Sequence, residues 1–415
     1  MNDNIPVIDL DLNRRRSSED EIITELLTAF TTIGFCTIIN HGISSELISN
    51  TFQVSKKFFD LPLEVKLKYK YLSPKSNRGY IPSGMETHDK TYDSNSNSDC
   101  DSLSSVTIIP PDKKETMDIG YDDDNNNNDD EIVFKNNWPD KDIIDSSLSN
   151  DHDDDDSINF HDVIDEYFSL MDKLYLRLMK YIGQGLGLPD DGDYLVQRCN
   201  QHHENLRLLH YPGGNINNAN SSNSNIRGNA HTDFGALTLL VQDEVGGLKV
   251  RSNNNESEEW IDVKPVPNSI IVNVGDMLMR WSNDKLKATL HKVETPPTIN
   301  TTTTYTRDEI DSCTTRTISD VHGIDDNHKE EEEEEEEKVN TIDVIIPERY
   351  SIAFFCNVNK DVNIECLETC CNDTDNPPKY PIINSYEYLT QRLAATIQTS
   401  TSTTTSTSTT TTESS

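Results

Sequence analysis

From Asn205 onward the chain is a series of short apolar runs separated by glycine, proline and asparagine, and this pattern constrains the fold most strongly. The runs are rich in Leu, Val, Ile and Thr and read LRLLHY, ALTLLVQ, GLKV, WIDV, SIIVNV, KATLHKV and YSIAFF. Many short strands separated by turn residues are typical of a β-sandwich or barrel. The sequence therefore predicts a mainly β core.

Helical patterns precede this core. Apolar residues recur at helical spacing from Ile22 to Ile33, and a second helix is expected to run to Phe58, after the strand CTIIN. A longer apolar stripe extends from Phe160 to Ile182 and ends at a cluster of glycines. We expect this long helix to support one side of the sheet.

Two strongly acidic segments interrupt the chain. Residues 89–157 carry a net charge of −16 and residues 299–347 carry −11, so they supply most of the total of −37. Such segments bury too little apolar surface to offset the entropy of ordering them. We expect both inserts and the Thr/Ser tail to be disordered, and we expect the asparagine-rich segment after Asn215 to be a loop. The negative charge also disfavours binding to nucleic acid or to a membrane surface.

The composition changes divide the chain into six expected parts. They are an N-terminal region of helices and first strands (1–88), an acidic low-complexity insert with a short segment near 132–142 that resembles a known family (89–157), a long supporting helix (158–190), a β domain interrupted by a disordered insert at 299–346 (203–358), a C-terminal segment with a helix (359–398) and a disordered tail (399–415).

The termini and the cysteines indicate a cytoplasmic protein. The N-terminus has no apolar signal-peptide core, and no stretch approaches the roughly eighteen apolar residues that span a bilayer. Eight cysteines are scattered without a CxxC pair, which suits reduced thiols better than a disulfide framework. Cys366, Cys370 and Cys371 form a cluster, but no nearby histidine or fourth thiolate would complete a tetrahedral metal site.

His231, Asp233 and His291 form the pattern with the clearest chemical meaning. His231 and Asp233 are two residues apart beside an apolar run, and alternate side chains of a strand share one face. His291 lies in another predicted strand, LKATLHKV. Two imidazoles and one carboxylate on one side of an ion make the facial triad of non-haem Fe(II) oxygenases, which leaves positions open for substrate and O₂.

A second pair of residues predicts carboxylate binding. Arg349 and Ser351 are also two residues apart in a predicted strand and are expected to share a face. A guanidinium beside a hydroxyl holds a carboxylate by charge-assisted hydrogen bonds. The nine other histidines are interpreted as structural; they are His41, His88, His152, His161, His202, His203, His210, His322 and His328.

Together these motifs resemble the iron and 2-oxoglutarate-dependent dioxygenases, in the branch similar to isopenicillin N synthase and the iron/ascorbate oxidoreductases. The resemblance is carried in order by IPVIDL, GFCTIINHGI, KKFFDLP, NRGYIPSGMET, NLRLLHYP, AHTDFGALTLLVQDEVGGLKV, WIDVKPVPNSIIVNVGDMLMRWSNDKLKATLHKV and RYSIAFF. It covers most of the chain outside the polar inserts. One departure from the family is the separation of His291 and Arg349 by 58 in residue number, which the acidic insert explains.

The resemblance implies a double-stranded β-helix (jelly roll) and an oxidoreductase that hydroxylates a small molecule with release of succinate and CO₂. It implies that His231, Asp233 and His291 bind Fe(II), and that Arg349, Ser351 and Tyr211 bind the far carboxylate of 2-oxoglutarate. Ascorbate is a further expected reductant, and a monomer is expected. Two alternatives stay open: an oxidase of the same fold that does not use 2-oxoglutarate, and a non-catalytic jelly-roll binding protein.

Overall fold

The computed structural model describes most of the chain. The described ranges are 5–12, 18–87, 110–122, 135–140, 158–215, 226–252, 259–295, 299–305, 339–372 and 374–396. Statements below refer to these residues. The asparagine-rich loop after Asn215, the tail 399–415 and the central parts of both acidic inserts lie outside them, so the expectations of a loop and of disorder there stay predictions.

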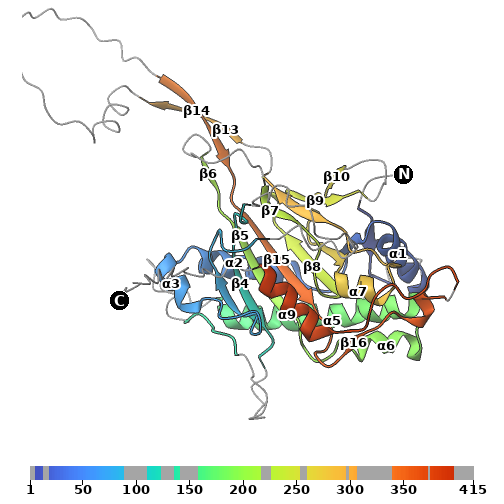
Figure 1. Ribbon diagram of the computed structural model, residues 1–415. Coiled ribbons are helices and arrows are strands. Elements are labelled where there is room, and N and C mark those ends of the chain that lie inside the picture. The colour runs from blue at the N-terminus through green and yellow to red at the C-terminus, as the bar shows by residue number, and fades with distance from the viewer. Residues whose placement is uncertain are drawn as a thin grey trace, which may run out of the picture.

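A large sheet forms the centre of the molecule (Figure 1). Its strands, in spatial order, are β1 (Val7–Asp9), β2 (Phe35–Ile39), β11 (Ile270–Val274), β8 (Leu237–Gln242), β15 (Arg349–Cys356), β5 (Asn205–Tyr211), β4 (Glu115–Gly120) and β3 (Gly79–Ile81). All neighbours are antiparallel except β1 and β2, which are parallel. The order mixes strands from both ends of the chain, so the sheet joins the two halves of the sequence.

Three smaller sheets complete the β structure. One contains β10 (Trp260–Asp262), β9 (Leu248–Arg251), β12 (His291–Glu294) and β7 (Ile226–His231), one contains β13 (Ile299–Tyr305), β14 (Val339–Ile346) and β6 (Gly214–Asn215), and one pairs β16 (Asn363–Ile364) with β17 (Ile383–Asn384). The first of them carries two of the three predicted iron ligands.

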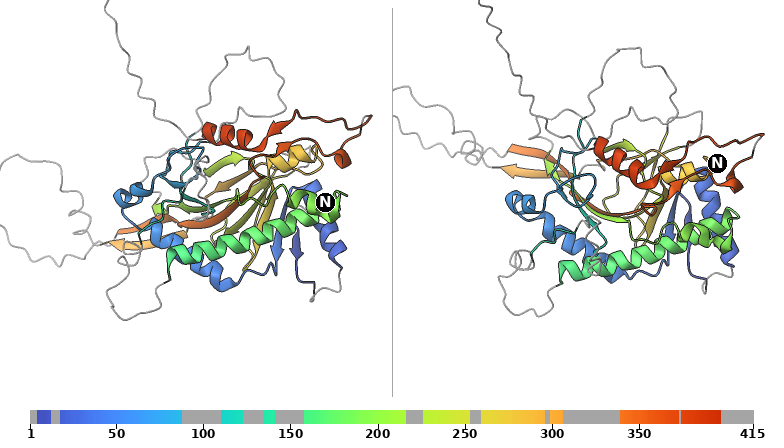
Figure 2. Two further views of the ribbon diagram at one scale, coloured as in Figure 1. Left: turned by 90° about the horizontal axis from the view of Figure 1, so that it is seen from below. Right: turned by 60° about the horizontal axis from the view of Figure 1, so that its bottom comes forward.

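Helices cover the two sides of the large sheet unequally. They are α1 (Glu19–Thr32), α2 (Ser45–Phe59), α3 (Leu63–Lys66), α5 (Phe160–Gly185), α6 (Asp193–Val196), α7 (Asp276–Trp281) and α9 (Ser385–Thr396), with short 3-10 turns at Leu67–Tyr69, Asp190–Gly192 and Glu368–Cys370. The long helix α5 runs along one face with α1 and α2, and α9 lies on the other side (Figure 2). The predicted supporting helix is therefore confirmed. None of the described helices is long and apolar enough to cross a membrane.

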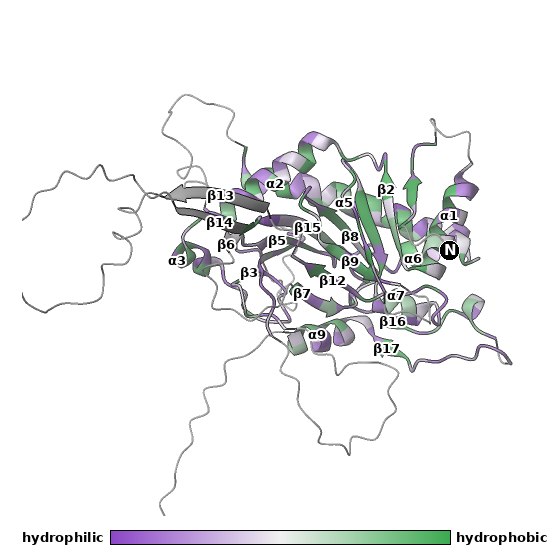
Figure 3. Ribbon diagram, turned by 90° about the horizontal axis from the view of Figure 1, so that it is seen from above, coloured by the Kyte–Doolittle hydropathy of each residue, from purple (hydrophilic) through white to green (hydrophobic). Residues whose placement is uncertain are grey.

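The pleat of the sheet separates two hydrophobic clusters. On β15, Ile352 and Phe354 pack in the cluster beneath the helices, whereas Ala353 packs in a smaller cluster between the two sheets. The same alternation holds on β5, where Leu208 faces the helices and Leu209 faces the small sheet. Figure 3 shows apolar residues concentrated on the central strands. The space between the sheets is where the candidate site lies.

The prediction of disorder is wrong for part of the first acidic insert. Residues Glu115–Gly120 form β4, a fully buried strand between β3 and β5. Its acidic side chains have partners: Glu115 lies 2.7 Å from the Lys66 ammonium and Asp118 pairs with Arg207. Averaging the charge over 69 residues hid a short ordered segment whose charges are neutralised by residues far away in the sequence.

The second insert is also more ordered at its ends than predicted. Strands β13 and β14 pair in antiparallel register from Ile299 opposite Ile345 to Tyr305 opposite Val339. Backbone hydrogen bonds between two threonine-rich or β-branched segments form this ribbon, which projects from the body in Figure 1. Residues 306–338 lie outside the described residues.

Candidate active site

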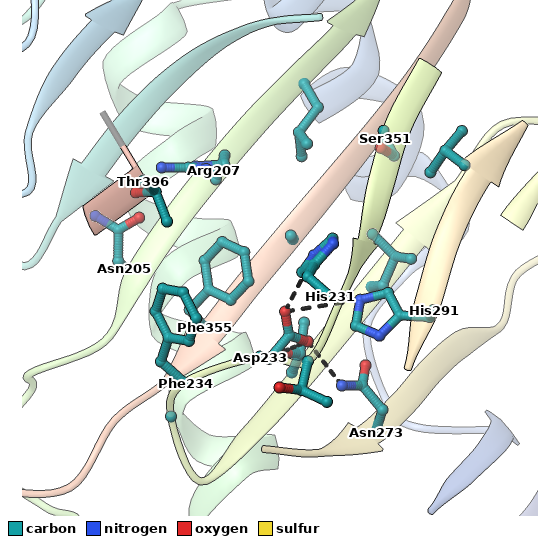
Figure 4. Close-up of a pocket in the computed structure, with 18 of the residues that line it drawn as sticks. Asn205, Arg207, His231, Asp233, Phe234, Asn273, His291, Ser351, Phe355 and Thr396 are labelled. Carbon is teal, nitrogen blue, oxygen red and sulfur yellow. Dashed lines mark hydrogen bonds and ion pairs between the residues drawn. The ribbon is translucent and has the colours of Figure 1, made fainter. Parts of the chain in front are cut away.

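The three predicted metal ligands converge on one point between the sheets. His231 ends β7 and His291 begins β12, and the two residues are direct cross-strand partners. Nε2 of His231 lies 3.8 Å from Oδ1 of Asp233, and Nε2 of His291 lies 3.7 Å from the same oxygen. Figure 4 shows the three side chains pointing toward one another. The fold therefore brings together the three residues that the sequence pattern predicts as metal ligands.

The local geometry differs from the predicted one at Asp233. The sequence placed His231 and Asp233 on one strand face, but β7 ends at His231 and Asp233 lies in the following turn. The turn is held by backbone hydrogen bonds from Asp276 to the Asp233 carbonyl and from Met277 to the carbonyls of Phe234 and Gly235. The carboxylate is thus aimed by a turn and not by strand alternation.

Hydrogen bonds on the far side of each ligand orient it. Nδ1 of His231 lies 2.7 Å from the Asn229 carbonyl, and Nδ1 of His291 lies 3.2 Å from the Thr289 carbonyl. Each Nδ1 therefore donates its proton to a carbonyl, and each Nε2 is left with its lone pair toward the cavity.

The Asp233 carboxylate is oriented in the same way. Its Oδ2 accepts hydrogen bonds from Thr238 Oγ1 at 2.6 Å and from Asn273 Nδ2 at 2.7 Å. These bonds hold the carboxylate in place and leave Oδ1 toward the two imidazoles. Two neutral nitrogens and one carboxylate oxygen fit the donor set that divalent iron takes in a facial triad.

The predicted carboxylate-binding residues also lie together, in the same cavity. Arg349 Nη1 donates to Ser351 Oγ at 3.1 Å, and the Arg349 guanidinium lies 4.8 Å from the centre of the Tyr211 ring. Arg349 is buried and also donates to the Gly246 carbonyl and to Gln242. These three bonds use three of its five N–H groups, so further donors remain for a ligand.

Arg227 is a second cation at this end, and the sequence analysis did not single it out. It lies on β7, four residues before His231, and is buried. Burial and then the charge of Arg349 lower the pKa of its guanidinium. Two buried guanidiniums within electrostatic reach of each other favour an anion between or beside them. The register of β7 shifts between Arg227 and His231, so strand alternation in the sequence gave no signal for its position.

Aromatic and amide side chains form the other half of the cavity. The cavity has an empty volume of about 1090 Å³, which includes the solvent at its mouth. Phe234 and Phe355 lie side by side, with Asn205 and Thr396 next to them (Figure 4). Thr396 belongs to α9, so the C-terminal helix closes part of the cavity. The sequence predicted a helix within residues 359–398, but it did not indicate that this helix lines the cavity.

A buried network of charged side chains forms one wall of the aromatic half of the cavity. Arg207 donates to both carboxylate oxygens of Asp118, at 2.7 and 2.9 Å, and to Glu86 at 2.9 Å. Lys114 lies 3.2 Å from Glu86 and 2.5 Å from Asp112. Burial lowers the pKa of Arg207, but Asp118 and Glu86 outweigh it and the net shift is upward. With two cations and three carboxylates, this wall carries no positive excess.

Comparison with known proteins identifies the family. Residues 5–141 match the family model described as the N-terminal region of the non-haem dioxygenase in morphine synthesis. Residues 202–307 match the model of the 2OG-Fe(II) oxygenase superfamily. The chain is 32% identical over 272 residues to the 2-oxoglutarate-dependent dioxygenase ecdK of Aspergillus rugulosus, covering 65% of this chain and 74% of that protein. The chain belongs to the 2OG-Fe(II) oxygenase superfamily.

Other members of the superfamily match over nearly the whole chain. The proline hydroxylase buaE of Petromyces alliaceus is 26% identical, with 93% of this chain and 96% of that protein covered. A full-length Neurospora crassa protein, whose crystal structure holds α-ketoglutarate and thymine, is 31% identical, with a TM-score of 0.66 and 94% and 96% of the two chains covered. These matches confirm the mainly β fold with a jelly-roll core.

The comparisons also decide between the activities left open by sequence. This oxygenase is an oxidoreductase that depends on Fe(II) and 2-oxoglutarate, because its relatives are named for that activity and its structural neighbours hold α-ketoglutarate. It is not a non-catalytic binding protein of the same fold. It acts on a small-molecule substrate with O₂.

Proposed function

We propose that His231, Asp233 and His291 bind the catalytic Fe(II) of this hydroxylating oxygenase. The observation that carries the proposal is the convergence of two Nε2 atoms and one Oδ1 while the other polar atom of each side chain is hydrogen-bonded to the protein. When bound, the iron would allow O₂ to oxidise both the substrate, by two electrons, and 2-oxoglutarate, by two electrons, to give succinate and CO₂. The residues fix the three ligand atoms and leave the cavity side open.

The far carboxylate of 2-oxoglutarate is proposed to lie against Arg349 and Ser351. Arg349 provides a buried positive charge with N–H groups still available, and Ser351 provides a hydroxyl 3.1 Å from that guanidinium. Tyr211 lies beneath the guanidinium and is proposed to donate its hydroxyl proton to the same carboxylate. Charge-assisted bonds of this kind fix both the position and the direction of a dicarboxylate.

The substrate is proposed to be a small, uncharged, flat molecule such as a pyrimidine base. It would lie against the rings of Phe234 and Phe355, with the amide of Asn205 at its edge. Asp118 and Glu86 accept hydrogen bonds from three of the five N–H groups of Arg207 and neutralise its charge, so Arg207 presents no unbalanced charge. A substrate with its own carboxylate would meet a wall that holds three carboxylates and two cations.

A substrate screen tests this proposal. Purified protein with Fe(II) and 2-oxoglutarate is given thymine, other pyrimidines or free proline, and succinate formation is measured. We expect an uncharged pyrimidine to stimulate succinate release and proline to leave it at the background rate. Stimulation by proline alone would overturn the proposed substrate class while leaving the iron site intact.

The remaining parts of the proposal concern the oligomeric state, the location, the partners and the domain organisation of the enzyme. We propose a monomer in the cytoplasm that does not bind nucleic acid, and one catalytic unit built from the N-terminal region, the long helix and the β domain. The acidic excess of the chain and the free thiols of the six described cysteines support these statements. Light scattering of the purified protein tests the monomer, since a mass well above 47.0 kDa would contradict it.

A further inference from the structure

A second cluster of metal-ligating side chains lies outside the cavity. Asp172 comes from α5, and His202 and Glu204 come from the segment just before β5. One potential ligand atom from each of the three lies within 4.8 Å of the others. Nδ1 of His202 is 3.4 Å from Oδ2 of Asp172. Sequence analysis interpreted His202 as structural, because its two partners are not in a recognisable spacing with it.

The cluster lies on the helix side of the large sheet, away from the iron. Glu204 precedes Asn205, which lines the cavity, and successive side chains of an extended chain point to opposite sides. In keeping with this, Glu204 is within electrostatic reach of Tyr175 on α5. The Tyr121 ring stacks on the His202 ring with centroids 4.3 Å apart. The cluster is therefore a separate site with its own surroundings.

The buried carboxylate of Glu204 has no hydrogen-bond partner in the part of the chain that the structure describes. The residue is 1% exposed, and neither of its side-chain oxygens makes a hydrogen bond to another described residue. The same is true of Oδ1 of Asp172, which is also buried. Buried polar oxygens are almost always hydrogen-bonded, so each exception requires an explanation. In the iron site, by contrast, Asp233 Oδ2 has two donors.

The charges of the cluster are not balanced by the protein. Among the described residues no lysine or arginine forms an ion pair with Asp172 or Glu204. Burial, and then the charge of Asp172, raise the pKa of the Glu204 carboxyl well above its ordinary value. Even a protonated His202 would leave one negative charge if both carboxylates were ionised. A buried group of this kind needs either a proton or a cation.

We propose that Asp172, His202 and Glu204 bind one divalent transition-metal ion, of which Zn²⁺ is the best-suited probe. Zinc binds imidazole nitrogen and carboxylate oxygen, and it accepts water as a fourth ligand beside three protein ligands. The side chain of His202 is 38% exposed, so the site has an entry path and room for water. The ion joins α5 to the start of β5 and fixes the long helix to the sheet. This inference does not rest on the proposed iron ligands.

Metal stoichiometry tests the proposal in a chain that lacks the iron site. The full-length double variant His231→Gln/His291→Gln is stripped with a chelator, loaded with Zn²⁺, gel-filtered and analysed for metal. We expect about one zinc per chain, and a rise in Tm on loading, because metal binding to the folded state is linked to stability. Adding Glu204→Gln should reduce the zinc to near zero and abolish the rise in Tm.

Two further variants keep the result interpretable. His202→Gln changes a partly exposed residue, so it should fold even if Glu204→Gln does not, and it should also lose the zinc. His161→Gln is the matched control, because His161 lies 3.7 Å from Asp162 but lacks a buried third ligand. It should keep about one zinc per chain. The proposal is overturned if the double variant holds no zinc, or if its zinc survives both His202→Gln and Glu204→Gln.

Discussion

The active-site cavity has an iron half, which holds the proposed metal ligands, and a substrate half, which holds the aromatic and amide side chains. The two halves differ in how their polar side chains are used. In the iron half, hydrogen bonds to the protein orient each ligand from behind, and the atoms that remain, such as Nε2 of His291 and Oδ1 of Asp233, face the cavity. In the substrate half, Asp118 and Glu86 neutralise the charge of Arg207, so this side chain presents no unbalanced charge to a ligand. The iron half therefore presents atoms that can bind an ion, whereas the charges of the substrate half are already neutralised by each other.

This difference indicates where specificity arises. The iron half can hold the same ion and cosubstrate in many relatives, because a few directed atoms define it. The substrate half is defined by shape and by neutralised charge, with contributions from β4, β5, β15 and α9. Changes in the iron half should therefore affect all turnover, whereas changes in the substrate half should alter the choice of substrate. The following predictions test this separation.

The largest expected effect is loss of a proposed metal ligand. His291→Ala removes one of the three converging atoms, so succinate formation should fall by more than the roughly 100-fold expected for loss of a bond that only orients a ligand. Circular dichroism should show an intact fold, and His161→Ala, an exposed histidine, serves as the control. Full activity of His291→Ala would show that the iron is bound elsewhere.

A smaller effect is expected for the cosubstrate cation. Arg349→Lys keeps the charge but loses the planar pair of N–H groups that grips a carboxylate. A loss of about 1.5 to 3 kcal/mol corresponds to a roughly 10- to 150-fold higher KM for 2-oxoglutarate. The KM for the substrate should change little. If the KM for 2-oxoglutarate is unchanged in a variant of normal Tm, Arg349 does not hold its carboxylate.

A change in the substrate half should alter the KM for the substrate and leave the KM for 2-oxoglutarate unchanged. Phe355→Leu keeps an apolar side chain but removes the flat ring, whose stacking contributes about 0.5 to 1.5 kcal/mol. The KM for the substrate should rise roughly 2- to 10-fold, and the KM for 2-oxoglutarate should stay the same. Equal shifts in both constants would mean that the two halves are not separate.

The smallest effect is expected outside the cavity. Replacing residues 301–343 by a short Gly/Ser linker removes most of the ribbon formed by β13 and β14, which projects from the body of the molecule. Closing a surface loop costs little and depends only weakly on its length. Turnover and Tm should therefore be nearly unchanged. A folded variant that binds iron but has lost activity on its substrate would mean that this segment closes over or docks to something.

The two halves also differ in how well the sequence predicts them. His231, Asp233, His291 and the pair Arg349 and Ser351 were predicted, because their chemistry requires particular residue types at short spacings near strand ends. The neutral wall was missed, because the charges of Asp118 and Arg207 cancel only after β4 and β5 pair. Averaged composition even assigned β4 to a disordered insert.

The same reasoning explains the errors at the edges of the fold. The helices and core strands follow from apolar periodicity, which a single segment contains. The contribution of α9 to the cavity and the pairing of β13 with β14 depend on contacts between segments distant in sequence, and their polar composition gave no local signal. The unpartnered Glu204 could not be detected either, since burial is a property of the folded chain.

The most direct test of the account is the visible charge-transfer absorption that ferrous iron acquires when a 2-oxo acid chelates it, measured without O₂. Wild-type protein and Glu204→Gln should both develop this band when Fe(II) and 2-oxoglutarate are added, and His231→Gln/His291→Gln should not. A band that persists in the double variant, or one that disappears only in Glu204→Gln, would contradict the assignment of the iron to His231, Asp233 and His291.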